Sequence, residues 1–180
     1  MRSYLFTSLF LLIGFSLSAQ TIDQARLEAL TEKQWQSGLR LLNELVAMPN
    51  DAVYPEQIAV NIAWCEAAFS KRNWTVDRLE TGGIPLLLVE KKQPNAKKTA
   101  LFYFHVDGQA VDISKWDQKN AYQPVLKAQS ANGTWEQLPM EKLQSEYNAD
   151  WRIFGRSTSD DKGPLAMFLT AWDALTAAGI

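Results

Sequence analysis

The residues best suited to chemistry in this chain lie in two short segments. His105 is the only histidine and begins His105-Val106-Asp107, and a later turn contains Asp160-Asp161-Lys162. Imidazole nitrogens and carboxylate oxygens are zinc ligands. Because residues two apart on a strand share a face, Asp107 can accept one ring N–H of His105 while the other nitrogen binds a metal. We therefore expect a metal site, although His-x-Asp alone also fits a buried histidine hydrogen-bonded to an acid.

The turn around Asp160 is the more informative segment. Residues 155–164 read Gly-Arg-Ser-Thr-Ser-Asp-Asp-Lys-Gly-Pro, between an expected strand and an expected helix. A carboxylate here lies near the positive end of that helix, which favours its ionised form and allows it to bridge two cations. Helix capping is the alternative interpretation. A cap explains one such residue but not the whole run.

The surrounding pattern predicts an α/β fold with a mixed, largely parallel sheet and flanking helices. Helices are expected over 22–47, from Pro55 with Ile58, Ile62, Cys65 and Phe69 as its apolar stripe, and from Pro164 onward. Strands are expected over 74–79, 84–89, 100–104 and 151–154, with a hairpin over 124–138. The continuous apolar run 100–104 is typical of a central strand, which would place His105 and Asp107 at its carboxyl end.

The N-terminus has the pattern of a secretory signal. Met1-Arg2 is followed by an apolar run and by small residues near Ala19, so residues 1–19 are interpreted as a signal peptide and the mature chain, residues 20–180, as exported, either periplasmic or extracellular. The run is short for a membrane span, so none is expected after signal removal. A net charge of -2 gives no basic field, which excludes nucleic acid as an expected partner. Cys65, the only cysteine, is expected to be a buried free thiol.

The two motifs resemble those of the co-catalytic di-zinc exopeptidase and deacylase family, which includes carnosinases, bacterial dipeptidases, glutamate carboxypeptidase and acetylornithine deacetylase. The matching residues are His105-Val106-Asp107 and the run from Gly155 to Pro164. Trp116-Asp117 and the segment from Gln123 to Leu126 are similar to the dipeptidase-like branch. Ser157 stands where the family usually has glycine.

The resemblance implies a role for each site residue. His105 would bind one zinc, Asp160 would bridge two zincs, and Asp107 would orient His105 as the catalytic partner. Asp161 and Lys162 would be supporting groups. In the family a Glu-Glu pair, a further acid and a second histidine complete the site, and an inserted domain forms the homodimer. We expect these parts to lie beyond residue 180, which makes the chain the N-terminal part of the catalytic domain and inactive by itself.

The expected function of the complete protein is an exported zinc exopeptidase that cleaves dipeptides or short peptides through a metal-activated water. A deacylase of N-acyl amino acids is the alternative within the same family. An exported binding module that keeps the fold without catalysis is the alternative from another class. A secreted α/β domain whose motifs match by chance is the third.

Overall fold

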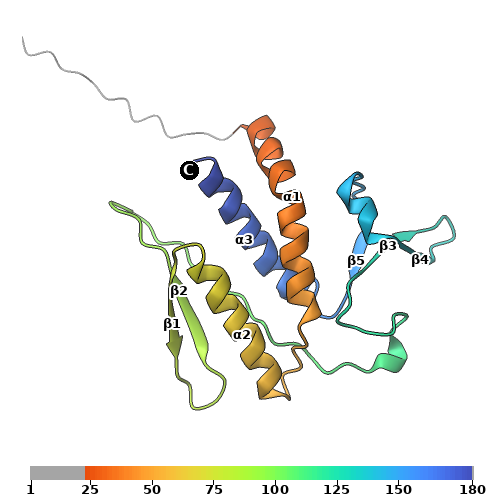
Figure 1. Cartoon of the computed structure of the whole chain (residues 1–180), viewed down its shortest axis with the longest axis horizontal. Helices are drawn as coiled ribbons and strands as arrows, with labels where there is room; N and C mark the ends of the chain where they lie inside the picture. The colour runs from red at the N-terminus through yellow and green to blue at the C-terminus, as the bar shows by residue number, and fades with distance from the viewer. Residues whose placement is uncertain (1–22, 180) are drawn as a thin grey trace, which may run out of the picture.

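The computed structural model describes residues 23–179 (Figure 1). In this range the chain is mixed helix and strand, with α-helices and two small antiparallel sheets. The largely parallel sheet predicted from the sequence is wrong, because every strand pair in this range runs antiparallel. The predicted signal peptide lies outside the described residues. Between residues 23 and 179, no helix combines the length and apolar character needed to cross a membrane.

Helix α1 (Gln24–Ala47) packs along α3 (Lys162–Ala177), as Figure 1 shows. Asp23 caps α1, since its Oδ1 accepts the N–H of Arg26 at 2.8 Å. Gly38 of α1 lies close to Thr170 of α3. A Cβ atom at this position would lie 2.9 Å from Thr170 Oγ1, so glycine permits the close approach.

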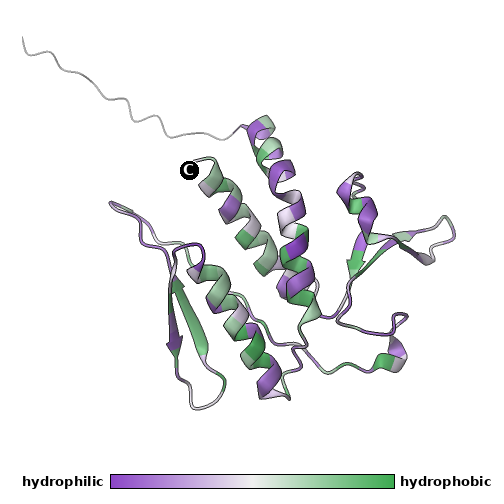
Figure 2. Cartoon of the chain, in the orientation of Figure 1, coloured by the Kyte–Doolittle hydropathy of each residue, from purple (hydrophilic) through white to green (hydrophobic). Residues whose placement is uncertain are grey.

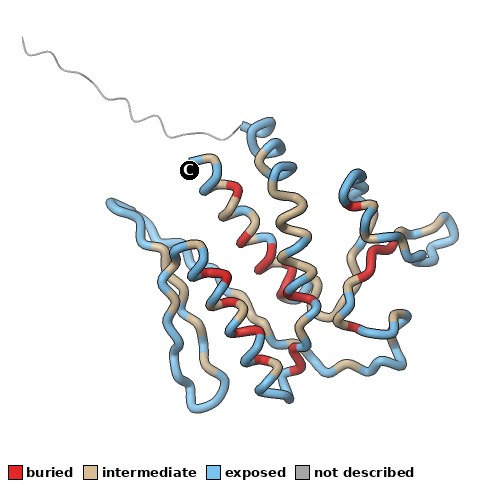
Figure 3. The backbone as a smooth tube through the Cα atoms, in the orientation of Figure 1, coloured by how far each residue is buried: buried red, intermediate tan, exposed pale blue. Residues whose placement is uncertain are grey.

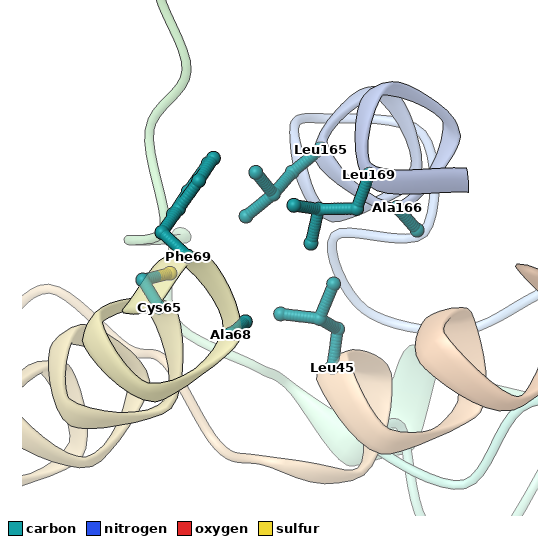
Figure 4. Packing of buried hydrophobic residues seen from close by; sticks show 7 residues of the cluster. All are labelled: Leu45, Cys65, Ala68, Phe69, Leu165, Ala166 and Leu169. Atoms are coloured by element: carbon teal, nitrogen blue, oxygen red, sulfur yellow. The ribbon is translucent and has the colours of Figure 1, made fainter. Parts of the chain in front are cut away.

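Helix α2 (Pro55–Ser70) begins at a proline, as expected, and all four residues of its predicted apolar stripe are buried. The three helices together form the main core. Figure 4 shows its members: Leu45 from α1, Cys65, Ala68 and Phe69 from α2, and Leu165, Ala166 and Leu169 from α3. Buried positions lie along the inner faces of these helices (Figure 3). Helix α1 carries more hydrophilic positions than α2 and α3 (Figure 2), in keeping with its more exposed N-terminal half.

The strands form two separate antiparallel sheets. The bounds are β1 (Thr75–Leu79) and β2 (Leu86–Glu90) in one sheet, and β3 (Val125–Gln129), β4 (Trp135–Leu138) and β5 (Arg152–Phe154) in the other, with β3 central. Thr75 lies opposite Glu90, and Leu126 lies opposite both Leu138 and Ile153. The predicted hairpin is confirmed, and Gly133 in its turn has a φ of 87°, which favours glycine. Short 3₁₀ helices lie at Ile113–Lys115 and Met140–Gln144.

The predicted central strand over 100–104 is not a strand. Leu101 and Tyr103 are 89% and 80% exposed, whereas the rings of Phe102 and Phe104 contact Phe168 of α3. The segment thus contacts α3 through one face only, and on that face Phe102 is still 59% exposed. A strand needs the backbone groups of a neighbour, and in residues 23–179 this segment joins neither the β1–β2 sheet nor the β4–β3–β5 sheet. The apolar composition of residues 100–104 was therefore not sufficient to predict that they pair with another strand.

Candidate metal centre

Two loops carry the predicted site residues. His105 follows the extended segment that packs on α3, where the Phe104 and Phe168 ring centroids are 5.3 Å apart. Asp160 lies in the turn between β5 and α3. His105 Nε2 lies 2.9 Å from Asp160 Oδ1, across 55 positions of sequence. The fold therefore brings the two predicted zinc ligands into direct contact.

Asp107 lies on the other side of the imidazole ring. His105 Nδ1 is 3.1 Å from the Asp107 carbonyl oxygen and 3.3 Å from its carboxylate Oδ1. Both oxygens are acceptors, so this edge of the ring favours Nδ1–H as the donor. The arrangement directs Nε2 toward Asp160, as metal binding through Nε2 requires. The backbone carbonyl, which the sequence did not indicate, is the nearer of the two acceptors.

The ring has an acceptor at each nitrogen, which affects its protonation. Burial by itself lowers the pKa of His105. The hydrogen bonds to the Asp160 carboxylate and the Asp107 carbonyl, together with the two negative charges, outweigh burial and place this pKa above its ordinary value. The second ring proton occupies Nε2 in this state. A metal ion bound between His105 and Asp160 would take the place of that proton.

Asp161 and Lys162, the predicted supporting residues, face different parts of the structure. Asp161 Oδ2 accepts the backbone N–H of His105 at 3.3 Å, linking the two loops a second time. Asp161 precedes α3, and its peptide bond with Asp160 is cis, but its side chain makes no capping hydrogen bond to the helix. The capping interpretation therefore does not account for Asp161.

Lys162 is fully buried at the start of α3. Its Nζ donates to the carbonyl oxygens of Leu45 and Met48, each at 2.6 Å. These carbonyls lie at the C-terminal end of α1, where few backbone donors remain; that of Leu45 also accepts the Met48 N–H at 3.3 Å. Burial lowers the pKa of Lys162 to about 8, opposed by the charge interaction with Cys65. Lys162 thus joins the start of α3 to the end of α1 and does not face the His105–Asp160 contact.

The described residues fit part of a zinc site. In tetrahedral coordination, nitrogen and oxygen ligands lie about 3.3 Å apart, because each is about 2 Å from zinc. The distance of 2.9 Å between Nε2 and Oδ1 is slightly shorter, and the Asp160 side chain, 86% exposed, is free to turn. Within residues 23–179, no three His, Cys, Asp or Glu side chains converge as a metal-binding group. The donor set is chemically suitable but supplies only two of about four ligands.

Three residues that the sequence did not nominate hold the two loops together. Asn50 is fully buried, and its Nδ2 donates to the Val106 carbonyl and to Ser157 Oγ. Gly108 packs against both side chains. Ser157 has a φ of 61°, a conformation that favours glycine and matches the glycine of the resembling family. In the sequence, Ser157 and Gly108 stand out only as departures from the pattern of the resembling family, and Asn50 belongs to no motif.

The chain matches no family model and no curated protein. The resemblance to the di-zinc hydrolases therefore stays a prediction made from the two motifs of the sequence.

Proposed function

We propose that the chain provides the first zinc ligands of an exported hydrolase that releases an amino acid from a dipeptide or other short peptide. The observation that carries this proposal is the contact between His105 Nε2 and Asp160 Oδ1 at 2.9 Å, with Nδ1 held by Asp107. A histidine oriented by an acid and facing a second carboxylate is a common arrangement of zinc ligands. The Asp160 side chain is open to solvent, so an ion or substrate has access to it.

Each residue has a distinct task in this proposal. His105 binds zinc through Nε2, Asp160 binds through its carboxylate, and Asp107 fixes the orientation of the ring. The Asp161 carboxylate holds the backbone of His105 by accepting the His105 N–H. When bound, zinc supplies a Lewis acid that polarises the scissile carbonyl and lowers the pKa of water. The same groups serve N-acyl amino acid deacylation, so the deacylase remains the alternative activity.

Two donors do not complete the coordination of zinc, so the residues described are insufficient for hydrolysis. We expect the 180-residue chain to bind at most one zinc, weakly, and to turn over neither dipeptides nor N-acyl amino acids. Metal analysis that finds two tightly bound zinc ions per chain would contradict this expectation. Turnover of either substrate class would also contradict it, and would identify the activity.

The test is a zinc titration of the purified chain and of two variants, His105→Ala and Asp160→Ala. Each variant removes one of two donors, so we expect the zinc affinity to fall at least tenfold in both. Asp150→Ala removes another exposed carboxylate, in the turn before β5, and is the matched control. Equal zinc affinity in all four proteins would refute the proposed metal centre.

A further inference from the structure

Asn50 lies at the junction of three segments that are distant in sequence. It follows α1 and Pro49, and none of its surface is exposed. Its Nδ2 donates to the Val106 carbonyl at 2.7 Å and to Ser157 Oγ at 3.0 Å. Val106 lies between His105 and Asp107, and Ser157 lies in the turn that leads to Asp160. One amide group therefore contacts both loops of the metal centre.

The backbone beside Asn50 holds the first loop at a second point. The N–H of Gly108 donates to the Asn50 carbonyl at 2.6 Å, and the N–H of Ala52 donates to the Gly108 carbonyl at 2.9 Å. Asp51 and Gly108 thereby form a parallel bridge. Val106 and Gly108, the neighbours of Asp107 on either side, are both attached to the segment after α1. The position of Asp107, and of the ring nitrogen that contacts it, is set by these attachments.

The junction has little free space. A Cβ atom on Gly108 would lie 2.7 Å from Ser157 Oγ and 3.0 Å from Asn50 Nδ2. Because Asn50 is fully buried, water cannot readily replace its amide as a donor to Val106. Small movements of either loop are therefore resisted by packing as well as by hydrogen bonds.

We propose that Asn50 is a positioning residue of the metal centre that sets the separation of His105 and Asp160, an inference that rests on the proposed function. Asn50 does not contact the metal or the substrate. It acts through the Val106 carbonyl and the Ser157 hydroxyl, which belong to the two loops that carry the ligands. Outer residues that orient metal ligands contribute substantially to metal affinity.

The chain offers a closely matched control. Asn61 of α2 is also fully buried, and its Nδ2 also donates to two carbonyls, those of Pro49 and Gln57, each at 2.8 Å. Neither acceptor belongs to the loops of the metal centre. Asn50→Ala and Asn61→Ala therefore remove the same number of buried hydrogen bonds, but only the first removes bonds made directly to the two loops, whereas the second frees the Pro49 carbonyl that precedes Asn50.

The experiment measures Zn²⁺ affinity and Tm for the wild-type chain and both variants. We expect similar losses of Tm, a drop in zinc affinity of at least tenfold for Asn50→Ala, and a clearly smaller drop for Asn61→Ala, which acts on the loops only through Pro49. Equal changes in zinc affinity, or none in Asn50→Ala, would overturn the inference. If the wild type binds zinc no better than His105→Ala, the proposed function fails, and the inference fails with it.

A second variant covers the case in which Asn50→Ala does not fold. Ser157→Ala removes only the hydroxyl that accepts from Asn50. Alanine also carries a Cβ atom, so the substitution leaves the backbone strain at this positive φ unchanged. We expect a loss of zinc affinity of about threefold with little change in Tm, because Asn50 keeps its bond to Val106. Unchanged zinc affinity in Ser157→Ala would count against Asn50 as the link between the loops.

Discussion

Phe168 connects the helical core to the loop that carries His105, which makes it the most informative residue to change. Its ring lies at the centre of an aromatic group whose members, with their centroid distances, are Phe102 at 4.9 Å, Phe104 at 5.3 Å, Trp74 at 6.0 Å and Phe69 at 6.3 Å. Phe168→Ala removes the surface on which the segment 101–104 rests. We expect both the free energy of unfolding and the position of His105 to change.

The magnitude follows from burial. Truncation of a buried phenylalanine to alanine costs about 3–5 kcal/mol, and Phe168 is only partly buried, so we expect about 3 kcal/mol. For a domain of this size, 1 kcal/mol corresponds to about 2–4 °C in Tm. Phe168→Ala should therefore lower Tm by about 6–12 °C. Met167→Ala is the control, because Met167 is next in sequence and 66% exposed; its effect should stay within about 0.5 kcal/mol.

Two assays separate the local effect from general destabilisation. Limited chymotrypsin digestion under native conditions should cleave Phe168→Ala faster after Phe102, Tyr103 or Phe104 than the Met167 control. Cleavage after Trp135, in the distant β4, is the internal reference. Zinc affinity should fall at the same time, since His105 follows this segment. A loss of stability with unchanged relative cleavage and unchanged zinc affinity would refute the role of these ring contacts in placing His105.

Two further predictions concern pH. Burial raises the pKa of the Cys65 thiol to about 12, although the positive charge of Lys162 opposes this shift. In the unfolded chain the thiol has its ordinary pKa of 9.0. The unfolded state therefore ionises first, and the free energy of unfolding falls as pH rises from 9 toward 12. At 1.36 kcal/mol per pH unit, the loss in the free energy of unfolding by pH 10 is about 1.4 kcal/mol. Denaturant unfolding should show this loss in the wild type and not in Cys65→Ala. A difference in unfolding free energy between the two proteins that is the same at pH 8 and pH 10 would contradict the prediction. For His105, hydrogen bonds outweigh burial and predict a pKa above the ordinary value of 6.5. Asp160→Asn should lower this pKa, because it removes the negative charge beside Nε2. NMR titration of the single histidine measures the pKa in both proteins, and identical titration curves would exclude the Asp160 contact. Because zinc displaces the Nε2 proton, zinc affinity should fall as pH drops below that pKa, and pH-independent affinity between pH 5.5 and 8 would contradict metal binding through His105.

Local features of the chain were largely predictable from the sequence. The spacing of Ile58, Ile62, Cys65 and Phe69 identified the buried face of α2, and Pro55 identified its start. The predicted hairpin over 124–138 is formed by β3 and β4, with Gly133 in its turn. These features depend on interactions among residues close in sequence, where backbone preference and apolar periodicity act directly.

The segment 100–104 shows where such reasoning fails. Its residues have strong strand propensity, yet strand formation depends on backbone partners that are remote in sequence. In the structure, β1 and β2 pair with each other, and the segment rests on Phe168 through alternate side chains. The predicted central strand and the predicted parallel sheet were therefore wrong for one reason: the sequence does not reveal which remote segments pair through their backbones.

For the candidate site, the sequence by itself determined the chemistry: one histidine, an acid two residues later, and an acidic turn at the start of a helix. Only the tertiary structure decided that His105 Nε2 meets Asp160, that Asp161 contacts the His105 backbone, and that Lys162 faces α1. It alone identified Asn50, which belongs to no motif. The physical reason is that ligand type is a property of single residues, whereas ligand position results from buried hydrogen bonds and packing between segments far apart in the chain.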